Sequence, residues 1–264
     1  MSPFIFDGIP EWAIFVGLIL IFSGSAWVGF RLGQRRRQHA ETLAEKEAQV
    51  AGTASAAMLT LIGFLLGFTF SMAGSHFDSR RQLVIDDANV IDGTFAGTEF
   101  LQEPYRSNIR RTLIDYVVFR PSINEYERTT TQFDEFIGRS ERLQEQMLDE
   151  GMAAAKLDPT PLVASFVSSL NTLTDIHNIR TDLRWNRIPP MVFLALAFMS
   201  ALAMVLVGYV RGLNDTVALL SVLLLIITYA AVFTLVVDLD RHTEGFFFVS
   251  QQPMIELRDS LLAR

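Results

Sequence analysis

The sequence predicts an all-helical membrane protein in which four transmembrane helices carry a helical extramembrane domain, inserted between the second and third spans. Three observations lead to this fold class. Half of the residues are hydrophobic and only 19% are charged, an apolar share typical of membrane proteins. Four segments each hold the roughly 20 apolar residues that cross a bilayer. The polar region between the second and third segments repeats its apolar residues at helical spacing.

The four apolar segments are predicted to span the membrane at 11–30, 53–75, 189–210 and 217–237. They contain no Lys or Arg, and their one acidic residue, Glu11, lies at an edge. A signal peptide is the alternative for the first segment. Acidic rather than basic residues precede that segment, however, and its apolar run is too long for a signal peptide. We therefore interpret it as a true span.

These spans divide the chain into four predicted regions. They are spans one and two with a basic connecting loop, a helical extramembrane domain that continues spans two and three, spans three and four, and a C-terminal tail: 1–75, 76–187, 188–238 and 239–264.

The extramembrane region is expected to form four helices, because its apolar residues recur three and four positions apart, as Ile109, Leu113 and Tyr116 do. Helix-breaking residues mark the expected helix ends at Pro104, Pro121, Gly151, the DPTP segment 158–161 and Pro189-Pro190. The predicted helices cover about 77–103, 105–120, 123–150 and 160–187.

Charge predicts the orientation in a bacterial inner membrane. Asp7 and Glu11 precede the first span, whereas Arg31 and the run Arg35 to Arg37 follow it in a short loop. The positive-inside rule places such a loop in the cytoplasm. Arginines next to the helical domain argue for the opposite orientation, but long translocated domains weigh less in this rule; they are Arg80, Arg81, Arg180, Arg184 and Arg187. The helical domain is then expected in the periplasm.

The second span carries the candidate residues for a pore or constriction. Small residues recur on one helix face, a pattern that lets helix backbones approach closely in lipid, and phenylalanines lie largely on other faces. Aromatic rings in such a helix suit a constriction that gates by dewetting. The alternative is that the small face packs on a neighbouring span and the rings meet lipid. The candidates are Thr60, Gly63, Phe64, Gly67, Phe68, Phe70, Ser71, Gly74 and Phe77.

Charged residues follow where this helix is predicted to leave the membrane. A ring of them around an oligomer axis would concentrate ions in a vestibule. The alternative is a solvated face with ion pairs to arginines on the helix that enters the third span, which lie three and four positions apart. The residues concerned are Asp78, Arg80, Arg81, Asp86, Asp87, Asn89, Asp92, Arg180, Arg184 and Arg187.

Several function classes find no support in the sequence. There is no cysteine, and the four histidines lack the spacing of metal ligands. Phosphate-binding loops and hydrolase motifs are absent from the sequence, and the net charge of −7 does not suggest nucleic acid. We therefore expect no enzyme, no cofactor and no metal site.

Three stretches resemble the bacterial membrane family labelled "bestrophin-like", a domain of unknown function. They are FTFSMAGSHFDSRRQLVIDDANVIDGT, TLIDYVVFR and DLDRHTEGFFFVSQQPMIELRDSL. The resemblance covers about 50–120 and 185–260, with DLDR at 238–241 and Gly245 as family-marking residues.

The resemblance implies a channel-like architecture. Bestrophins are pentameric anion channels with four spans and a helical domain between spans two and three, and their second span lines a neck ringed by apolar side chains. By that analogy Phe64, Phe68, Phe70 and Phe77 are expected to form the constriction. The chain departs from bestrophins in its predicted periplasmic domain and in lacking an acidic run like their calcium clasp.

The sequence thus favours an oligomeric ion channel, possessing cyclic symmetry, with the second span lining the pore and with lipid, inorganic ions and further copies of itself as partners. A non-conducting membrane scaffold or sensor whose helical domain binds a partner is the alternative. A transporter ranks last, because Pro189-Pro190 lies at the start of a span and not in mid-membrane.

Overall fold

The computed structural model describes residues 6, 8–39, 41–120, 130–182, 187–214, 219–241 and 246–263. Within these ranges the regular structure is helical throughout, and strands are absent. The residues form two compact units, 1–76 with 187–247, and 77–186 with 248–264. We call the first the membrane unit and the second the helical unit.

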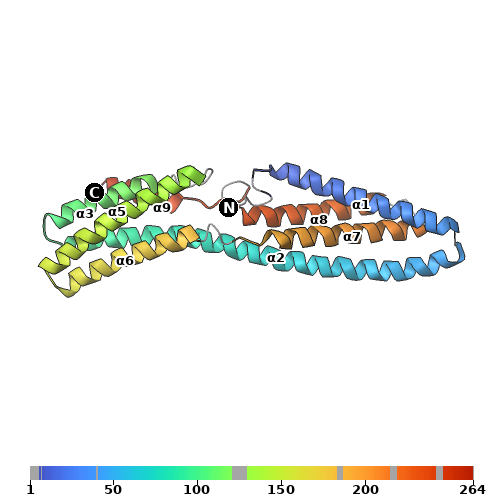
Figure 1. The fold of residues 1–264 in the computed structure, drawn as a ribbon, viewed down its shortest axis with the longest axis horizontal. Coiled ribbons are helices and arrows are strands. Elements are labelled where there is room, and N and C mark those ends of the chain that lie inside the picture. The colour runs from blue at the N-terminus through green and yellow to red at the C-terminus, as the bar shows by residue number, and fades with distance from the viewer. Residues whose placement is uncertain are drawn as a thin grey trace. The chain divides into compact units, whose positions relative to one another are not determined.

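The membrane unit contains four helices that are long and apolar enough to cross a bilayer (Figure 1). They are α1 (Glu11–His39), the first part of α2 (Glu41–Gly97), α7 (Pro190–Asn214) and α8 (Leu219–Asp240). Their positions confirm the four apolar segments read from the sequence. The helix α7 begins at a proline, which suits the first turn because its missing N–H has no helical partner there.

Glycines bring α1 and α7 into backbone contact. A Cβ on Gly29 would overlap the carbonyl oxygen of Val205, and one on Gly33 would lie 2.9 Å from the Cα of Gly212. On the other helix, a Cβ on Gly208 would overlap the carbonyl oxygen of Ala26. The paired positions rise together along both helices, so α1 and α7 run parallel.

In its described residues, the helical unit contains the rest of α2, the 3-10 turn η1 (Thr98–Phe100), and four further helices. These are α3 (Tyr105–Phe119), α5 (Thr130–Leu157), α6 (Pro161–Asp182) and α9 (Gln252–Leu262). Its apolar core includes Ile91, Leu113, Tyr116, Phe166 and Leu170. Met254, Leu257 and Leu261 on one face of α9 are buried in the same core, so the end of the chain belongs to this unit.

One predicted helix end is wrong. The sequence suggested a stop at Gly151, but α5 continues through this glycine to Leu157. A Cβ at Gly151 would lie 2.8 Å from Cδ1 of Leu170 and 3.5 Å from Cε1 of Phe166. The glycine therefore serves the close approach of α5 and α6 and not a chain turn. The other end of this predicted helix and Pro121 lie outside the described residues.

Candidate functional site: an open face of the second span

One face of α2 in the membrane unit is left uncovered by the other residues that the structure describes. The side chains of Phe64, Phe68 and Phe70 are 71%, 65% and 40% exposed. Between them lie smaller residues that are also exposed or half-exposed, so the expectation that the rings lie on other faces than the small residues is wrong. We call this set the open α2 face: Thr60, Gly63, Phe64, Gly67, Phe68, Phe70, Ser71 and Gly74.

The opposite face of α2 holds the helix in the membrane unit. Ile62, Leu66, Thr69 and Ala73 recur at helical spacing and are buried. On the α8 side, the Tyr229 hydroxyl donates a hydrogen bond of 2.7 Å to the carbonyl oxygen of Leu59. The helix therefore has one packed side and one unoccupied side.

The glycines of α2 do not make the close contacts that their spacing suggests. Around a Cβ built on Gly67 or Gly74 there is no other atom of the described residues within 4 Å, and Gly63 meets only the Tyr229 hydroxyl at 3.9 Å. Among the described residues of the protomer this small face makes no close contact, so tight packing of the face stays a prediction about other copies. The tight contact lies instead between α1 and α7, whose glycine pairs the sequence reading did not single out.

The open α2 face is chemically neutral. Its residues carry no charge. The Thr60 hydroxyl donates a hydrogen bond of 2.9 Å to the carbonyl oxygen of Ala56, one turn earlier. The hydroxyl oxygen keeps a lone pair for a further donor. Such a surface offers rings, small residues and a few hydroxyls to whatever covers it.

The predicted vestibule residues have varied environments. In the helical unit, Asp78, Arg81 and Asn89 are exposed, and Asp86 accepts a hydrogen bond of 2.9 Å from Gln82. Phe77 and Asp92 are half-exposed, and Arg80 is buried. Arg187 is half-exposed in the membrane unit. Arg184 lies outside the described residues.

Asp87 is the centre of a buried charge cluster in the helical unit. Both the carboxylate and the Arg120 guanidinium are 1% exposed, and they form an ion pair. Arg180 donates a second charged hydrogen bond to the same carboxylate oxygen at 2.7 Å. We call Asp87, Arg120, His177 and Arg180 the Asp87 cluster. The pairing with Arg180 was among the sequence alternatives, whereas Arg120 was missed.

Arg120 sets the tautomer of His177 and helps to set its protonation state. Its Nη1 lies 3.0 Å from Nδ1 of the imidazole, and because a guanidinium only donates, Nδ1 must accept. Burial, followed by the charge of Arg120, lowers the pKa of His177 to about 4. The histidine is therefore neutral at pH 7, which avoids adding a cation beside two arginines.

Neighbouring groups extend the Asp87 cluster. Arg120 stacks over the Tyr116 ring at 5.0 Å, and the Tyr116 hydroxyl accepts a hydrogen bond of 2.9 Å from the side chain of Gln144. Burial raises the pKa of Tyr116 to about 12. Arg180 also donates a hydrogen bond of 2.7 Å to the side-chain oxygen of Gln251, just before α9. The cluster therefore ties α2, α3, α6 and the end of the chain together.

The DLDR segment at 238–241 has a structural role in the membrane unit. Asp238 accepts backbone N–H groups from Phe246 and Phe247 at 3.1 and 3.2 Å. Asp240 accepts the N–H of Ile188 at 3.0 Å, and Arg241 donates to the carbonyl oxygen of Ile9 at 2.8 Å. These side chains satisfy backbone groups of three segments near the helix ends. Gly245 lies outside the described residues.

Among the described residues, no three His, Asp or Glu side chains gather where they would hold a metal ion. The buried acids Asp87, Asp238 and Asp240 each bond a guanidinium or a backbone N–H. They act as structural acceptors in the described fold.

The fold and its four apolar helices define a multi-pass α-helical membrane protein. A family model described as "Bestrophin-like domain" matches residues 16–254. The chain therefore belongs to the Bestrophin-like family, as the three sequence stretches suggested. Comparisons with curated proteins and with solved structures find no match.

Proposed function

We propose that this chain is the protomer of an oligomeric ion channel in the bacterial inner membrane, with the open α2 faces of several copies surrounding the ion path. The observation that carries the proposal is the uncovered face itself: Phe64 is 71% exposed although the opposite side of the same helix is packed. Small residues in lipid favour helix contacts over acyl chains. A further copy is the natural neighbour, because identical subunits close into rings.

The chemistry of the face suits a gated path. In a ring, the phenylalanines would form narrow apolar constrictions of the kind that close by dewetting, and the Thr60 and Ser71 hydroxyls would meet ions or water between them. The neutral face sets no charge preference. The family relationship to bestrophins favours anions as the conducted species.

The parallel course of α1 and α7 supports the predicted orientation. It brings Arg31 and Arg35 at the end of α1 to the same end of the membrane unit as Arg211 of α7. Short basic segments favour the cytoplasmic side, so the starts of α1 and α7 are periplasmic and the helical unit is periplasmic with them. An introduced cysteine at Met152, which is 44% exposed, is expected to react with a membrane-impermeant maleimide from the periplasm, whereas one at Arg35 is not.

Cross-linking tests the pore-lining role, because the chain has no cysteine of its own. Thiols introduced by Gly67→Cys are expected to cross-link neighbouring copies into a series of species that ends at one limiting oligomer size. The matched control is Phe198→Cys on α7, whose side chain is 64% exposed but faces no proposed partner. Dimers alone, or equal cross-linking at Phe198, would favour the scaffold alternative.

Recordings from reconstituted oligomer test conduction directly. Phe70→Ala is expected to change conductance or gating, because it removes a ring from the constriction. Phe198→Ala removes an equally apolar ring from α7 and is expected to leave currents unchanged. A cross-linked ring that passes no current in either form would contradict the channel proposal and support a scaffold.

A further inference from the structure

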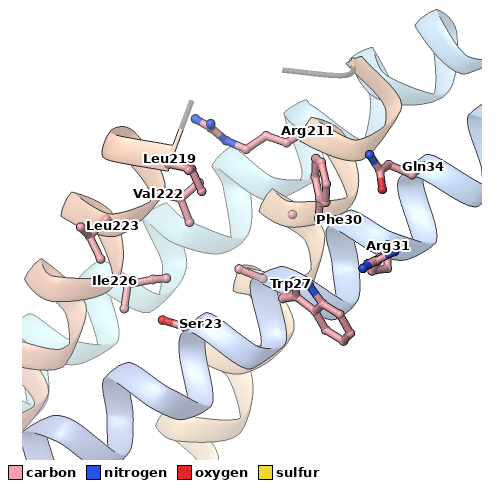
Figure 2. Close-up of a pocket in the computed structure, with 12 residues that line it drawn as sticks. Ser23, Trp27, Phe30, Arg31, Gln34, Arg211, Leu219, Val222, Leu223 and Ile226 are labelled. Carbon is pink, nitrogen blue, oxygen red and sulfur yellow. The ribbon is translucent and has the colours of Figure 1, made fainter. Parts of the chain in front are cut away.

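A cavity of about 620 Å³ opens in the membrane unit between α1, α7 and α8. Figure 2 shows its lining: Trp27, Phe30 and Arg31 come from α1, Arg211 from α7, and Leu219 to Ile226 from α8. The open α2 face takes no part in it. This cavity is therefore separate from the proposed ion path.

The two ends of the cavity differ in polarity. Ser23 and Ile226 lie toward the middle of the spans, whereas Arg31, Gln34 and Arg211 lie toward the end where α1 and α7 leave the membrane. From Ser23 to Gln34 the wall is about 16 Å long at 1.5 Å per residue. The cavity is thus an apolar slot about half a bilayer deep with guanidinium groups at its mouth.

The side of the slot is open to the lipid. Trp27, Leu219 and Leu223 are 59%, 74% and 47% exposed, and Arg31 stacks over the Trp27 ring at 5.1 Å. Tryptophan and arginine at a span's end are typical of the level of the headgroups. A lipid chain can therefore enter sideways while its headgroup remains at the level of the arginines.

We propose that this cavity is a binding site for one anionic phospholipid, with its acyl chain against Trp27, Leu223 and Ile226 and its phosphate near Arg31 and Arg211. Charge complementarity identifies the ligand, because basic pockets between spans on the cytoplasmic side suit anionic headgroups. A zwitterionic lipid is expected to bind more weakly than an anionic lipid, because its headgroup also brings a positive charge near the arginines. The site stands whether or not the protein conducts ions.

Fluorescence of Trp27 tests the site. In full-length protein with Trp12 and Trp185 replaced by phenylalanine, Trp27 is the one remaining tryptophan. Brominated phosphatidylglycerol in vesicles is expected to quench it at about fivefold lower mole fraction than brominated phosphatidylcholine. Arg211→Gln is expected to remove this preference, since one basic residue near the headgroups is worth about a fivefold change in affinity.

Arg35→Gln is the matched control, because Arg35 is exposed on the same helix but does not line the cavity. It is expected to keep the preference. Arg31→Gln is a second variant should Arg211→Gln fail to fold, since Arg31 is exposed and tolerates change.

Four outcomes would overturn the proposal. Equal quenching by both lipids means no headgroup recognition, and an equal loss in Arg35→Gln means general surface attraction. Loss of the preference on adding inorganic phosphate means a site for the free ion and not for a lipid. Absence of quenching by either lipid means that another copy covers the cavity.

Discussion

The two units of this protein are stabilised by different chemistry. In the membrane unit, α1 and α7 meet backbone to backbone at glycines, and the DLDR side chains bond to main-chain groups. In the helical unit, a large apolar core surrounds the buried Asp87 cluster. The hydrophobic effect stabilises apolar burial only for groups that would otherwise contact water, whereas helices in lipid associate through close packing and hydrogen bonds. The two units therefore differ in the interactions that stabilise them.

The largest expected effect tests the buried charges of the helical unit. Arg120→Ala leaves Asp87 with Arg180 as its remaining ion-pair partner among the described residues, and losing one member of a buried pair costs about 3–5 kcal/mol. Stability is measured through a Ser140→Cys reporter, because position 140 is buried in α5 and reacts only when the unit opens. This cysteine is expected to react with thiol reagents at least about a hundredfold faster in the Arg120→Ala protein than in the protein that keeps Arg120. Arg81→Ala, at an exposed position, is the control. Unchanged labelling in Arg120→Ala would mean that the Asp87 cluster contributes little to stability.

The next effect tests the glycine contact of the membrane unit. Gly208→Val places a side chain against the backbone of Ala26 and is expected to cost about 3 kcal/mol or more, because backbone cannot yield as a side chain does. Ser200 on α7 is 1% exposed, so the labelling rate of a Ser200→Cys reporter measures how often the membrane unit opens. Gly24→Val on α1, where a Cβ meets no other atom of the described residues within 4 Å, is the control, and equal labelling in both variants would mean that Gly208 serves no close contact.

Acid is expected to affect the helical unit through His177. The folded state holds the pKa of His177 near 4, below its ordinary value of 6.5. Between these values the unfolded chain binds a proton that the folded chain excludes, so stability falls as pH drops from about 6.5 to 4, by up to about 3 kcal/mol. His177→Gln keeps an acceptor for Arg120 but does not titrate. Labelling of Ser140→Cys that follows the same pH course in both proteins would contradict this role.

The smallest effect is the sharpest test of the contact between α1 and α7, because the same substitution is expected to change sign along α1. Gly24→Ala meets open space and gains helix propensity, so it should stabilise the membrane unit by about 0.5–1 kcal/mol. Gly33→Ala meets the backbone of α7 and should destabilise it. Labelling of Ser200→Cys compares the two, and a stabilising Gly33→Ala would refute the close contact.

Much of the fold was predictable from local pattern. The four apolar segments follow from hydropathy and length. Pro161 begins α6, because proline suits the first turn, and Pro104 is the N-cap residue just before α3. Gly151 was misread as an end, because a glycine that serves packing looks the same in sequence as one that serves a turn. Arg120 was missed because its partners, Asp87 and His177, are far away along the chain.

The sequence by itself determined the helical class, the four apolar helices and the family, because these depend on composition, local periodicity and residue stretches that can be read in order. The tertiary structure decided which glycines touch a neighbour and which charges are buried. It also showed which side of α2 remains open. Those properties depend on which helix lies opposite each residue, and a pattern such as Gly63 and Gly67 contains no information about its neighbour.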